Sequence, residues 1–502
     1  MARLHEYQGK KLLAEAGISV PRGRVADSAD IAESVVETIG CPVVMKIQAW
    51  TTGRKKLGGV SFIDSPEQTR SEAERLLNMK VGNFPVTEIL IEEKLPVRDE
   101  LFISLNIDDA SRQPVMLLAL EGGSGIEQRA SSVHRMLIDI NTGVVEEEVN
   151  KLLEQSQLEA RFYPGILAAV QSIWSVARKY EARSVEVNPL VITEGGDVIA
   201  ADCRMTIDDY AVFRHPELGI DIARELDHPP TELERIAYRL EQEDHRGTFY
   251  FAQLPVEEGK PKIGFHGAGG GGSMMSMDAI TKAGFAIANF TDTSGNPSVA
   301  KVYRAARCIL AQEGLCGYFG SGSGVASQEQ YHSAYGLAKA FNEMDLAIPA
   351  VIRLGGNSED RAVEILHECC KYLPGKVEGY KKDDTPEFIA ERFRQLVEEA
   401  EFATPKMARS VPSFVNDENT YSFPIRGGRV YIDHEHCDWE AMKHVVDNSS
   451  GLLINKDGKP VLAISEEEVA DKDSELIACE MECLRAGRPV VFVDLAIPGL
   501  DV

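Results

Sequence analysis

The chain has 502 residues, which at about 150 residues per domain corresponds to about three domains. Acidic residues outnumber basic residues by 79 to 53. The resulting net charge of −26 argues against general binding to nucleic acids or anionic membranes, although a local basic pocket could hold a small polyanion. No apolar run approaches the roughly 18 residues of a membrane helix, and no apolar signal segment is visible at the start. The nine cysteines form no CxxC motif, so a reducing cytoplasm is the expected compartment.

The first part of the chain, residues 1–240, mixes strand and helix patterns. An apolar run predicts a strand at Val43–Gln48, and helical spacing predicts a long helix from about Tyr163 to Tyr180. Two strands follow, Ser184–Ile192 and Val198–Met205, joined by a turn at Glu194-Gly195-Gly196. These patterns predict a mixed α/β domain.

A polar segment around His228-Pro229-Pro230 marks a domain boundary. In residues 250–400, strands and helices alternate regularly, which predicts a small parallel sheet with helices on both faces. Residues 401–502 contain short strand patterns and one convincing helix near Ser474–Ala486. We expect this last part to be a small α/β appendage of unknown role.

One polar segment of the last part could suggest a metal site. It is Asp433-His434-Glu435-His436-Cys437, followed by His444. The spacing matches no standard metal site, and a polar turn explains it better.

A basic, glycine-flanked loop, Thr51–Gly59, follows the strand at Val43–Gln48. Lys46 lies inside that apolar strand, where it needs a partner or water because burying an unpaired lysine is costly. The loop contains Gly53, Arg54 and Lys55. Glycines let backbone N–H groups approach an anion and the cations neutralise it, so the pattern favours polyphosphate binding. A solvated basic turn is an equally good interpretation.

The hairpin carries two side chains that suit a magnesium ion. If its loop has three residues centred on Gly195, Asn188 and Asp202 are cross-strand partners with Cβ atoms roughly 5 Å apart. A carboxylate and an amide oxygen at that spacing suit Mg²⁺, which takes hard oxygen ligands together with phosphate. Glu186 lies on the same face. A two-residue loop would break this pairing, and a polar edge hairpin is the alternative interpretation.

Four motifs in the first part of the chain form one set: Leu4-His5-Glu6-Tyr7-Gln8, Val43–Gln48, Glu186–Thr193 and Phe213–Leu218. This set resembles the ATP-grasp half of the β-subunits of succinyl-CoA synthetase and related NDP-forming acyl-CoA ligases. The resemblance runs collinearly over residues 1–400. It implies an ATP-grasp nucleotide-binding domain over residues 1–240 and a flavodoxin-like CoA-ligase domain over residues 250–400.

The resemblance also implies roles for individual residues of the first domain. The nucleotide phosphates would contact Lys46, Gly53, Arg54 and Lys55, and the base and ribose would lie near Glu92 and Glu100. The Mg²⁺ ligands would be Asn188 and Asp202. Glu186 would face a phosphorylated histidine that visits this site, so Glu186 and Lys46 are the expected catalytic residues.

A glycine run, Gly267–Gly272, follows a strand and opens a helix in the second domain. With Asp292 further along, it formally matches a dinucleotide-binding fingerprint. The match guarantees only free N–H groups at a helix N-terminus, which suit an anion such as a pyrophosphate, an acyl phosphate or a carboxylate.

The same run, together with Ala288–Asp292 and Ala350–Asn357, resembles the flavodoxin-like domain of the same β-subunits. In that family two glycine-rich loops bind the carboxylic acid jointly with the α-subunit. This implies substrate contacts for Gly267, Gly269, Gly320, Gly322 and Gly324, and we expect His266 to contact substrate or to be structural. Both loops depart from the succinate pattern, which favours a different di- or tricarboxylate.

The resemblance therefore implies a β-subunit of a nucleotide-dependent carboxylate–CoA ligase. Mg²⁺ with ATP or GTP would phosphorylate a histidine of an α-type, CoA-binding partner, the phosphate would pass to the acid, and CoA would displace it to give a thioester. A close variant is a citryl-CoA or malyl-CoA synthetase subunit. Two other classes are a nicotinamide-dependent oxidoreductase using Gly267–Gly272 and a non-catalytic nucleotide-sensing subunit.

Overall fold

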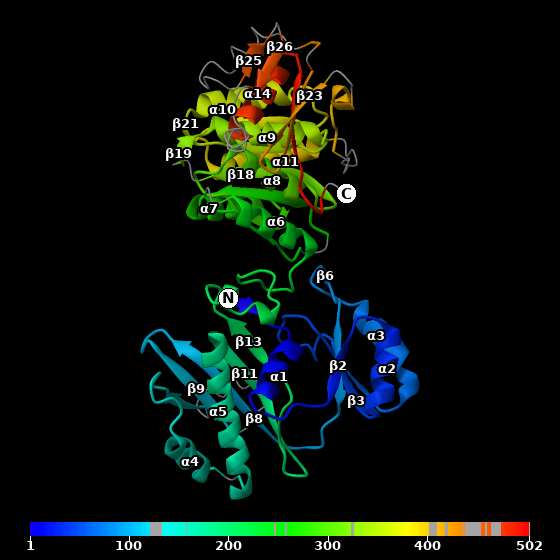
Figure 1. Ribbon diagram of the computed structural model, residues 1–502, viewed down its shortest axis with the longest axis vertical. Coiled ribbons are helices and arrows are strands. Elements are labelled where there is room, and N and C mark those ends of the chain that lie inside the picture. Colours follow the sequence, from blue (N-terminus) through cyan, green and yellow to red (C-terminus); the bar gives the residue numbers. More distant parts are fainter. Residues whose placement is uncertain are drawn as a thin grey trace. The chain divides into compact units, whose positions relative to one another are not determined.

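The computed structural model describes residues 1–120, 133–156, 158–244, 247–256, 259–322, 326–400, 409–416, 420–433, 435–436, 453–456, 459–462 and 473–500. The chain divides into two compact units, Met1–Pro230 and Thr231–Val502 (Figure 1). No helix among the described residues is long and apolar enough to cross a membrane.

The first unit contains two antiparallel sheets. The larger sheet has the order β1-β13-β11-β8-β9-β10, and β12 also pairs with β11. Its strands are β1 (Ala2–Arg3), β8 (Val97–Asp108), β9 (Gln113–Ala119), β10 (His134–Leu137), β11 (Ala182–Thr193), β12 (Val198–Ala200) and β13 (Arg204–Ile207). Helices α1 (Glu6–Glu15), α4 (Glu146–Glu154) and α5 (Tyr163–Tyr180) contribute to its core. The bounds of α5 confirm the predicted long helix.

The smaller sheet of the first unit has the order β2-β7-β3-β4. Its strands are β2 (Gly23–Ala26), β3 (Val43–Ile47), β4 (Val60–Ile63) and β7 (Ile89–Glu93). Helices α2 (Ala29–Ile39) and α3 (Thr69–Leu77) cover one face, and a short hairpin of β5 (Lys80–Val81) and β6 (Phe84–Pro85) precedes β7 (Figure 1). Apolar side chains from β3 and β7, such as Met45 and Ile91, face these helices and leave Lys46 on the opposite face.

The predicted three-residue loop of the hairpin is confirmed. Thr193 donates its backbone N–H to Asp197, which encloses residues 194–196. Leu190 pairs with Ala200 on one side, and Glu186 pairs with Arg204 on the other. Asn188 and Asp202 fall between these pairs in the same register, as predicted from a loop centred on Gly195.

The second unit is built on a sheet with the order β14-β17-β15-β18-β20-β22. Its strands are β14 (Tyr250–Gln253), β15 (Lys262–Ala268), β17 (Asn289–Asp292), β18 (Leu315–Gly322), β20 (Ala350–Arg353) and β22 (Val377–Tyr380), with β16 (Ala286–Ile287) also beside β15. All pairs are parallel except the edge strand β14. Apart from β14, chain order gives the sequence 2-1-3-4-5 across the sheet, which is the flavodoxin-like order. The predicted fold class is confirmed.

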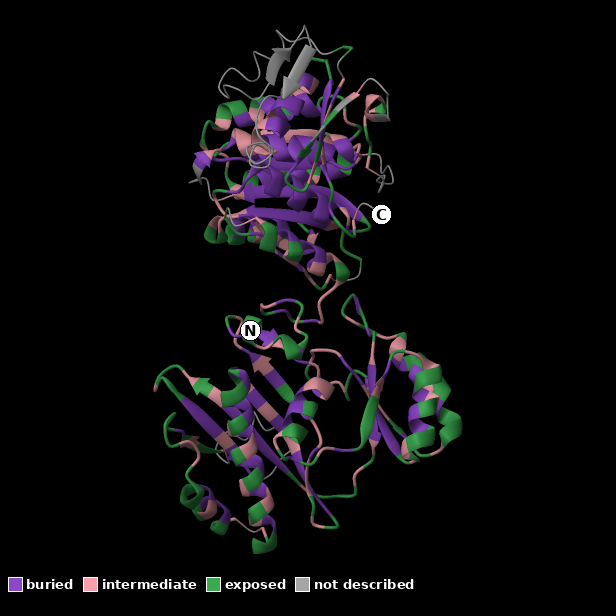
Figure 2. Cartoon of the chain, viewed as in Figure 1, coloured by how far each residue is buried: buried purple, intermediate pink, exposed green. Residues whose placement is uncertain are grey.

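Helices cover both faces of this sheet, so its central strands are buried (Figure 2). On one face lie α7 (Gly270–Lys282) and α11 (Pro386–Glu399). On the other lie α6 (Glu232–Glu243), α8 (Val299–Leu310), α9 (Tyr331–Glu343) and α10 (Glu359–Cys370). Neighbouring residues of β18 face opposite sides of the sheet. Tyr318 packs in the core with α8 and α9, and Phe319 packs in the core with α7 and α11. A two-stranded pair, β19 (Ala326–Glu329) and β21 (Gly356–Asn357), completes this region.

Helix α6 corrects the predicted end of the first domain. The sequence analysis placed residues 1–240 together, but Ile236, Ala237 and Leu240 of α6 belong to the core of the second unit. Since these apolar side chains pack on α8 and β14, the helix folds with the second sheet. The first unit therefore ends at Pro230.

The described part of the C-terminal extension packs into the second unit and has no separate core. It contains β23 (Thr420–Ile425), β24 (Gly428–Asp433) and β27 (Val491–Leu495) in one sheet, helix α14 (Asp473–Arg485), and a hairpin of β25 (Leu453–Lys456) and β26 (Lys459–Leu462). Helix α14 packs on α8, α9 and α10, and its Leu476 and Ile477 join their core. The described part of the predicted α/β appendage is thus a further layer of the second unit.

Buried ion pairs reinforce this contact. The Nζ of Lys339, which is fully buried on α9, lies 2.7 Å from Glu480 of α14 and 2.5 Å from Glu343. Arg409 lies 2.8 Å from Glu343 and 2.7 Å from Asp494. Breaking a buried pair leaves an uncompensated charge, so these contacts hold the extension in one position on α9.

We expect Ile477→Ala to destabilise the chain by about 3 kcal/mol, because it leaves a cavity in a shared core. Val411→Ala, at an exposed position of the same extension, should change the stability by less than about 0.5 kcal/mol. Urea-induced unfolding of the full chain measures both. An effect of Ile477→Ala as small as that of the control would show that the extension is not part of this core.

Candidate functional site

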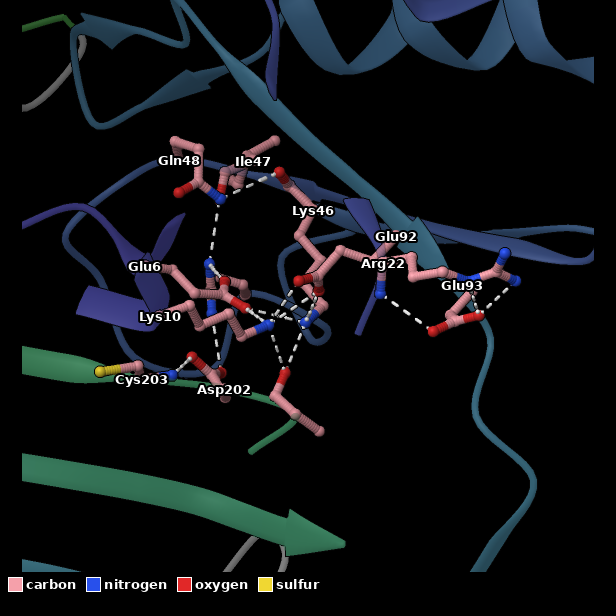
Figure 3. Close-up of polar contacts among 12 residues, drawn as sticks. Glu6, Lys10, Arg22, Lys46, Ile47, Gln48, Glu92, Glu93, Asp202 and Cys203 are labelled. Carbon is pink, nitrogen blue, oxygen red and sulfur yellow. Dashed lines mark hydrogen bonds and ion pairs between the residues drawn. The ribbon is translucent and has the colours of Figure 1, made fainter. Parts of the chain in front are cut away.

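Six charged side chains meet beside the smaller sheet of the first unit. Figure 3 labels five of them: Glu6, Lys10, Lys46, Glu92 and Asp202. Glu6 and Lys10 come from α1, Lys46 from β3 and Glu92 from β7. Arg54 comes from the loop between β3 and β4, and Asp202 from the segment between β12 and β13. We call these six residues the charge cluster. It unites segments from both sheets of the unit.

The two lysines of the charge cluster bind the same acceptors. The Nζ of Lys46 lies 2.8 Å from Glu6 Oε1, 2.8 Å from Glu92 Oε2 and 2.8 Å from the carbonyl oxygen of Ala201. The Nζ of Lys10 lies 2.8 Å from Glu6 Oε1, 2.7 Å from Glu92 Oε1 and 2.8 Å from the same carbonyl. The partner that a lysine in an apolar strand requires is therefore a pair of buried carboxylates.

Arg54 joins the cluster to the predicted metal ligand. One guanidinium nitrogen donates to Glu6 Oε2 at 2.7 Å and to the carbonyl of Ile47 at 3.1 Å. The other donates to Asp202 Oδ2 at 2.8 Å. This second bond directly links a predicted phosphate contact to a predicted metal ligand.

Glu6 and Lys46 stay charged at neutral pH. Burial alone would raise the pKa of Glu6, but the neighbouring Lys10, Lys46 and Arg54 hold that pKa well below its usual value. Burial alone would lower the pKa of Lys46, but Glu6, Glu92 and Asp202 raise it above its usual value. Opposite charges within bonding distance outweigh desolvation here.

The predicted phosphate loop is a compact turn. Gly53 has a φ of +67°, and its carbonyl accepts the N–H of Lys56 at 2.8 Å. The N–H of Gly59 bonds the carbonyl of Arg54 at 2.8 Å, which closes the loop. Gly53 and Lys55 are exposed, and the Lys55 ammonium lies 5.8 Å from the Phe62 ring centre. Arg54 therefore points into the cluster while Lys55 lies at the surface.

The two predicted base and ribose contacts lie in different environments. Glu100 is an exposed residue of β8, paired with Val191. Glu92 is 2% exposed, and both lysines bond its carboxylate. In this structure, the carboxylate of Glu92 therefore anchors both lysines.

The hairpin side chains fit a magnesium ion in chemistry and accessibility. Asp202 retains 27% exposure, and its Oδ1 accepts the N–H of Cys203 at 2.7 Å. Asn188 shares its register position across the hairpin, and Glu186 lies on the same strand face two residues away. One carboxylate and one amide oxygen suit Mg²⁺, which keeps several waters and binds phosphate oxygens as well.

The predicted acid site lies where the second sheet reverses its strand order. The carboxyl ends of β15 and β18 meet there: Gly267 pairs with Ser321, and Ala268 pairs with Gly322. Ligands in open α/β sheets bind at such a switch point. Gly324 lies outside the described residues.

The glycines at this point have different structural roles. A Cβ on buried Gly267 would collide with Ser273, and one on buried Gly320 would lie 2.9 Å from Ile352. These two residues are glycines because the chain packs closely. Gly269, with a φ of +92°, precedes α7 and leaves exposed Gly270 and Gly271 at the N-terminus of that helix. Backbone N–H groups at this end suit an anion.

His266 is packed as a structural histidine. It is buried, with Nδ1 2.6 Å from the Tyr318 hydroxyl and Nε2 3.0 Å from Thr293 Oγ1. Burial lowers the pKa of His266 to about 4, so the ring is neutral at pH 7. Since both nitrogens bond within the chain, the geometry favours the structural interpretation over substrate contact.

Asp292 uses one of its carboxylate oxygens for bonds within the chain. Its Oδ1 accepts the N–H groups of Gly269 at 3.0 Å and Ser294 at 2.7 Å. It therefore braces the glycine run from within. Together with the flavodoxin-like strand order, this disfavours the dinucleotide interpretation of Gly267–Gly272.

The segment considered as a metal site in the extension forms a local pair instead. His436 Nδ1 lies 2.9 Å from Asp433 Oδ2. His434, Cys437 and His444 lie outside the described residues. Across the part of the chain that the structure describes, no group of three or more His, Cys, Asp or Glu side chains could hold a metal ion.

Comparison with known proteins first defines the class. Residues 3–192 match the ATP-grasp domain family, which agrees with the two antiparallel sheets of the first unit. The fold is similar to a solved ATP citrate lyase from Methanothrix soehngenii, described in complex with citrate and coenzyme A. The TM-score is 0.60 at 17% identity, and the match covers 78% of this chain and 99% of that one.

The family follows from closer relatives. The chain is 32% identical to the β-subunit of a GDP-forming succinate–CoA ligase from Thermus thermophilus, over 75% of this chain and 97% of the relative. It is 30% identical to the ADP-forming β-subunit from Rubrobacter xylanophilus, over 73% of this chain and 92% of the relative. The chain therefore belongs to the family of succinate–CoA ligase β-subunits, which are acid–thiol ligases.

Sequence reasoning did not assign Glu6 or Lys10 to the site. Glu6 lies in the motif Leu4–Gln8, to which the resemblance assigns no role, and Lys10 lies outside all four motifs. Both lie on one side of α1 because residues four apart share a helix face. That spacing was the available signal, but a surface ion pair gives the same pattern.

We expect the free energy of unfolding of the second unit to depend less on pH in His266→Gln. The unfolded histidine has a pKa near 6.5 and the folded one about 4, so between these values the unfolded state binds an extra proton. Stability conferred by the neutral ring is complete above pH 6.5 and falls with decreasing pH, at up to about 1.4 kcal/mol per unit. Denaturant unfolding between about pH 4 and 7 measures the slope, and identical slopes in both proteins would contradict a buried neutral His266.

Proposed function

We propose that the chain is the β-type subunit of a nucleotide-dependent carboxylate–CoA ligase, and that its ATP-grasp unit binds a magnesium nucleotide. One observation carries this assignment. Lys46 and Arg54 lie within bonding distance of one carboxylate, Glu6, and Arg54 also bonds Asp202. A pair of partly accessible cations beside a carboxylate and an amide on one hairpin matches the charge pattern of a magnesium polyphosphate.

In this proposal the side chains of the site neutralise and align the phosphates. Lys46 and Arg54 turn from their carboxylate partners to the phosphate oxygens, and exposed Lys55 with the backbone around Gly53 extends the contact. Asn188 and Asp202 hold Mg²⁺, which would offset the charge that develops during phosphoryl transfer. Glu186, on the same strand face, orients a histidine supplied by an α-type partner.

The second unit supplies the acid site. N–H groups at the start of α7 and the carboxyl ends of β15 and β18 bind a carboxylate, jointly with the partner that brings CoA. Buried His266 fixes β15 by bonding Tyr318 and Thr293, so that the loop after it keeps its position. Backbone contacts of this kind select for charge more than for the length of the acid.

A second candidate is a subunit that forms citryl-CoA or malyl-CoA on the same scaffold. It is favoured by the second acid loop, Phe319–Val325, which lacks the Arg-Cys-Asp that follows the glycines in the succinate-type pattern. Thioester formation with succinate, malate and citrate, measured with an α-type partner, distinguishes the two candidates. The same assay with ATP and GTP decides the nucleotide.

We expect Asp202→Asn to remove the magnesium-dependent stabilisation that ATP or GTP gives to the purified chain. A ligand at about a hundred times its Kd should stabilise the wild-type chain by about 2.7 kcal/mol. The variant keeps the shape of the side chain but loses the anionic metal ligand. Asp197→Asn, in the turn of the same hairpin, is the matched control and should respond like the wild-type chain.

Calorimetry or thermal unfolding with Mg-ATP, Mg-GTP and NAD gives the answer. A response of Asp202→Asn equal to that of the wild-type chain would refute the metal assignment. A response to NAD alone would refute the proposed binding of a magnesium nucleotide and would point to Gly267–Gly272 as the ligand site. Nucleotide binding without turnover in a reconstituted complex would indicate a sensing subunit.

A further inference from the structure

Lys10 is the most deeply buried cation of the charge cluster. Its side chain is 4% exposed, whereas the side chains of Lys46 and Arg54 are 12% and 13% exposed. Figure 3 shows its ammonium group beside that of Lys46, between α1 and the strand that carries Glu92. An incoming phosphate therefore reaches Lys46 and Arg54 before Lys10.

The six charges of the cluster balance. Three cations, Lys10, Lys46 and Arg54, face three carboxylates, Glu6, Glu92 and Asp202. Lys46 and Arg54, the two cations of the cluster expected to bind phosphate, are thus already neutralised within the chain. Phosphate binding is consequently an exchange, in which Lys46 and Arg54 give up carboxylate partners.

The exchange would remove Lys46 and Arg54 as ion-pair partners of Glu6, and Lys46 as a partner of Glu92. Both are more than nine-tenths buried, and a buried charge without a partner is costly. Lys10 is the third cation of the cluster and bonds both carboxylates, at 2.8 Å from Glu6 and 2.7 Å from Glu92. It also bonds the carbonyl of Ala201 at 2.8 Å, next to Asp202.

We propose that Lys10 is a positioning residue of the nucleotide site, which keeps Glu6 and Glu92 neutralised when Lys46 and Arg54 turn to the phosphates. This inference rests on the proposed function of the first unit. Without Lys10, the two carboxylates hold Lys46 and Arg54 more tightly and compete with the nucleotide. Lys10 acts through these neighbours and does not touch the substrate.

The test compares Mg-ATP and Mg-GTP affinity in four full-length proteins by calorimetry. Lys10→Met should weaken binding of the preferred nucleotide by at least about tenfold, or about 1.4 kcal/mol. The double variant Lys10→Met/Glu6→Gln removes one cation and one carboxylate, so it restores the charge balance and should bind within about threefold of the wild-type chain. Arg22→Met, which removes an exposed ion pair with Glu93 on the same sheet, should bind as the wild-type chain does.

A kinetic measurement separates positioning from catalysis. With an α-type partner, Lys10→Met should raise the KM for the nucleotide by a similar factor and change kcat by less than about threefold. A loss confined to kcat would overturn the proposal. If Lys10→Met weakened binding only by damaging the fold, the added Glu6→Gln substitution would not restore nucleotide affinity.

The remaining outcomes are distinguishable. Unchanged affinity in Lys10→Met refutes the role of Lys10. A double variant that binds as weakly as Lys10→Met also refutes it, because Lys10 would then act on the nucleotide directly or through the fold. Failure of the wild-type chain to bind either nucleotide would instead refute the proposed function of the first unit.

Discussion

The first unit depends on its balanced charge cluster, in which the buried carboxylate of Glu6 bonds three cations from three different segments. Lys10 comes from the same helix, Lys46 from β3 and Arg54 from the loop after β3. Charges buried this deeply are tolerated only with opposite partners, so the balanced cluster as a whole fixes where these segments lie. The three cations therefore lie together in the structure, so the proposed polyphosphate would bind a site whose cations are already in place.

The second unit contributes backbone N–H groups at the N-terminus of α7, in place of charged side chains. The carboxyl ends of its parallel strands lie at one edge of the sheet. The strand order reverses between β15 and β18, and open α/β sheets bind ligands at such a switch point. Hydrogen bonds of buried His266 and of Asp292 hold the backbone in place at this switch point. The C-terminal extension adds a further layer on α8, α9 and α10, bound by Lys339 and by a shared core.

Local sequence patterns predicted many of the helices and strands and the register of the hairpin that carries Asn188 and Asp202. The helix Tyr163–Tyr180 follows from its spacing, and the pairing of Asn188 with Asp202 follows from one turn centred on Gly195. Lys46 could be predicted to need a partner, but the identity of that partner depends on Glu6 and Glu92, far away in the sequence. His266 and the extension show the same limit, since a buried hydrogen bond or a shared core is set by tertiary packing.

The most direct test of the account is a structure of the chain with Mg²⁺ and a non-hydrolysable nucleotide. The account predicts that Arg54 leaves Asp202 and binds phosphate, that the metal lies on Asp202 and Asn188, and that Lys10 stays with Glu6 and Glu92. A nucleotide bound while the 2.8 Å pair between Arg54 and Asp202 remains intact would contradict it.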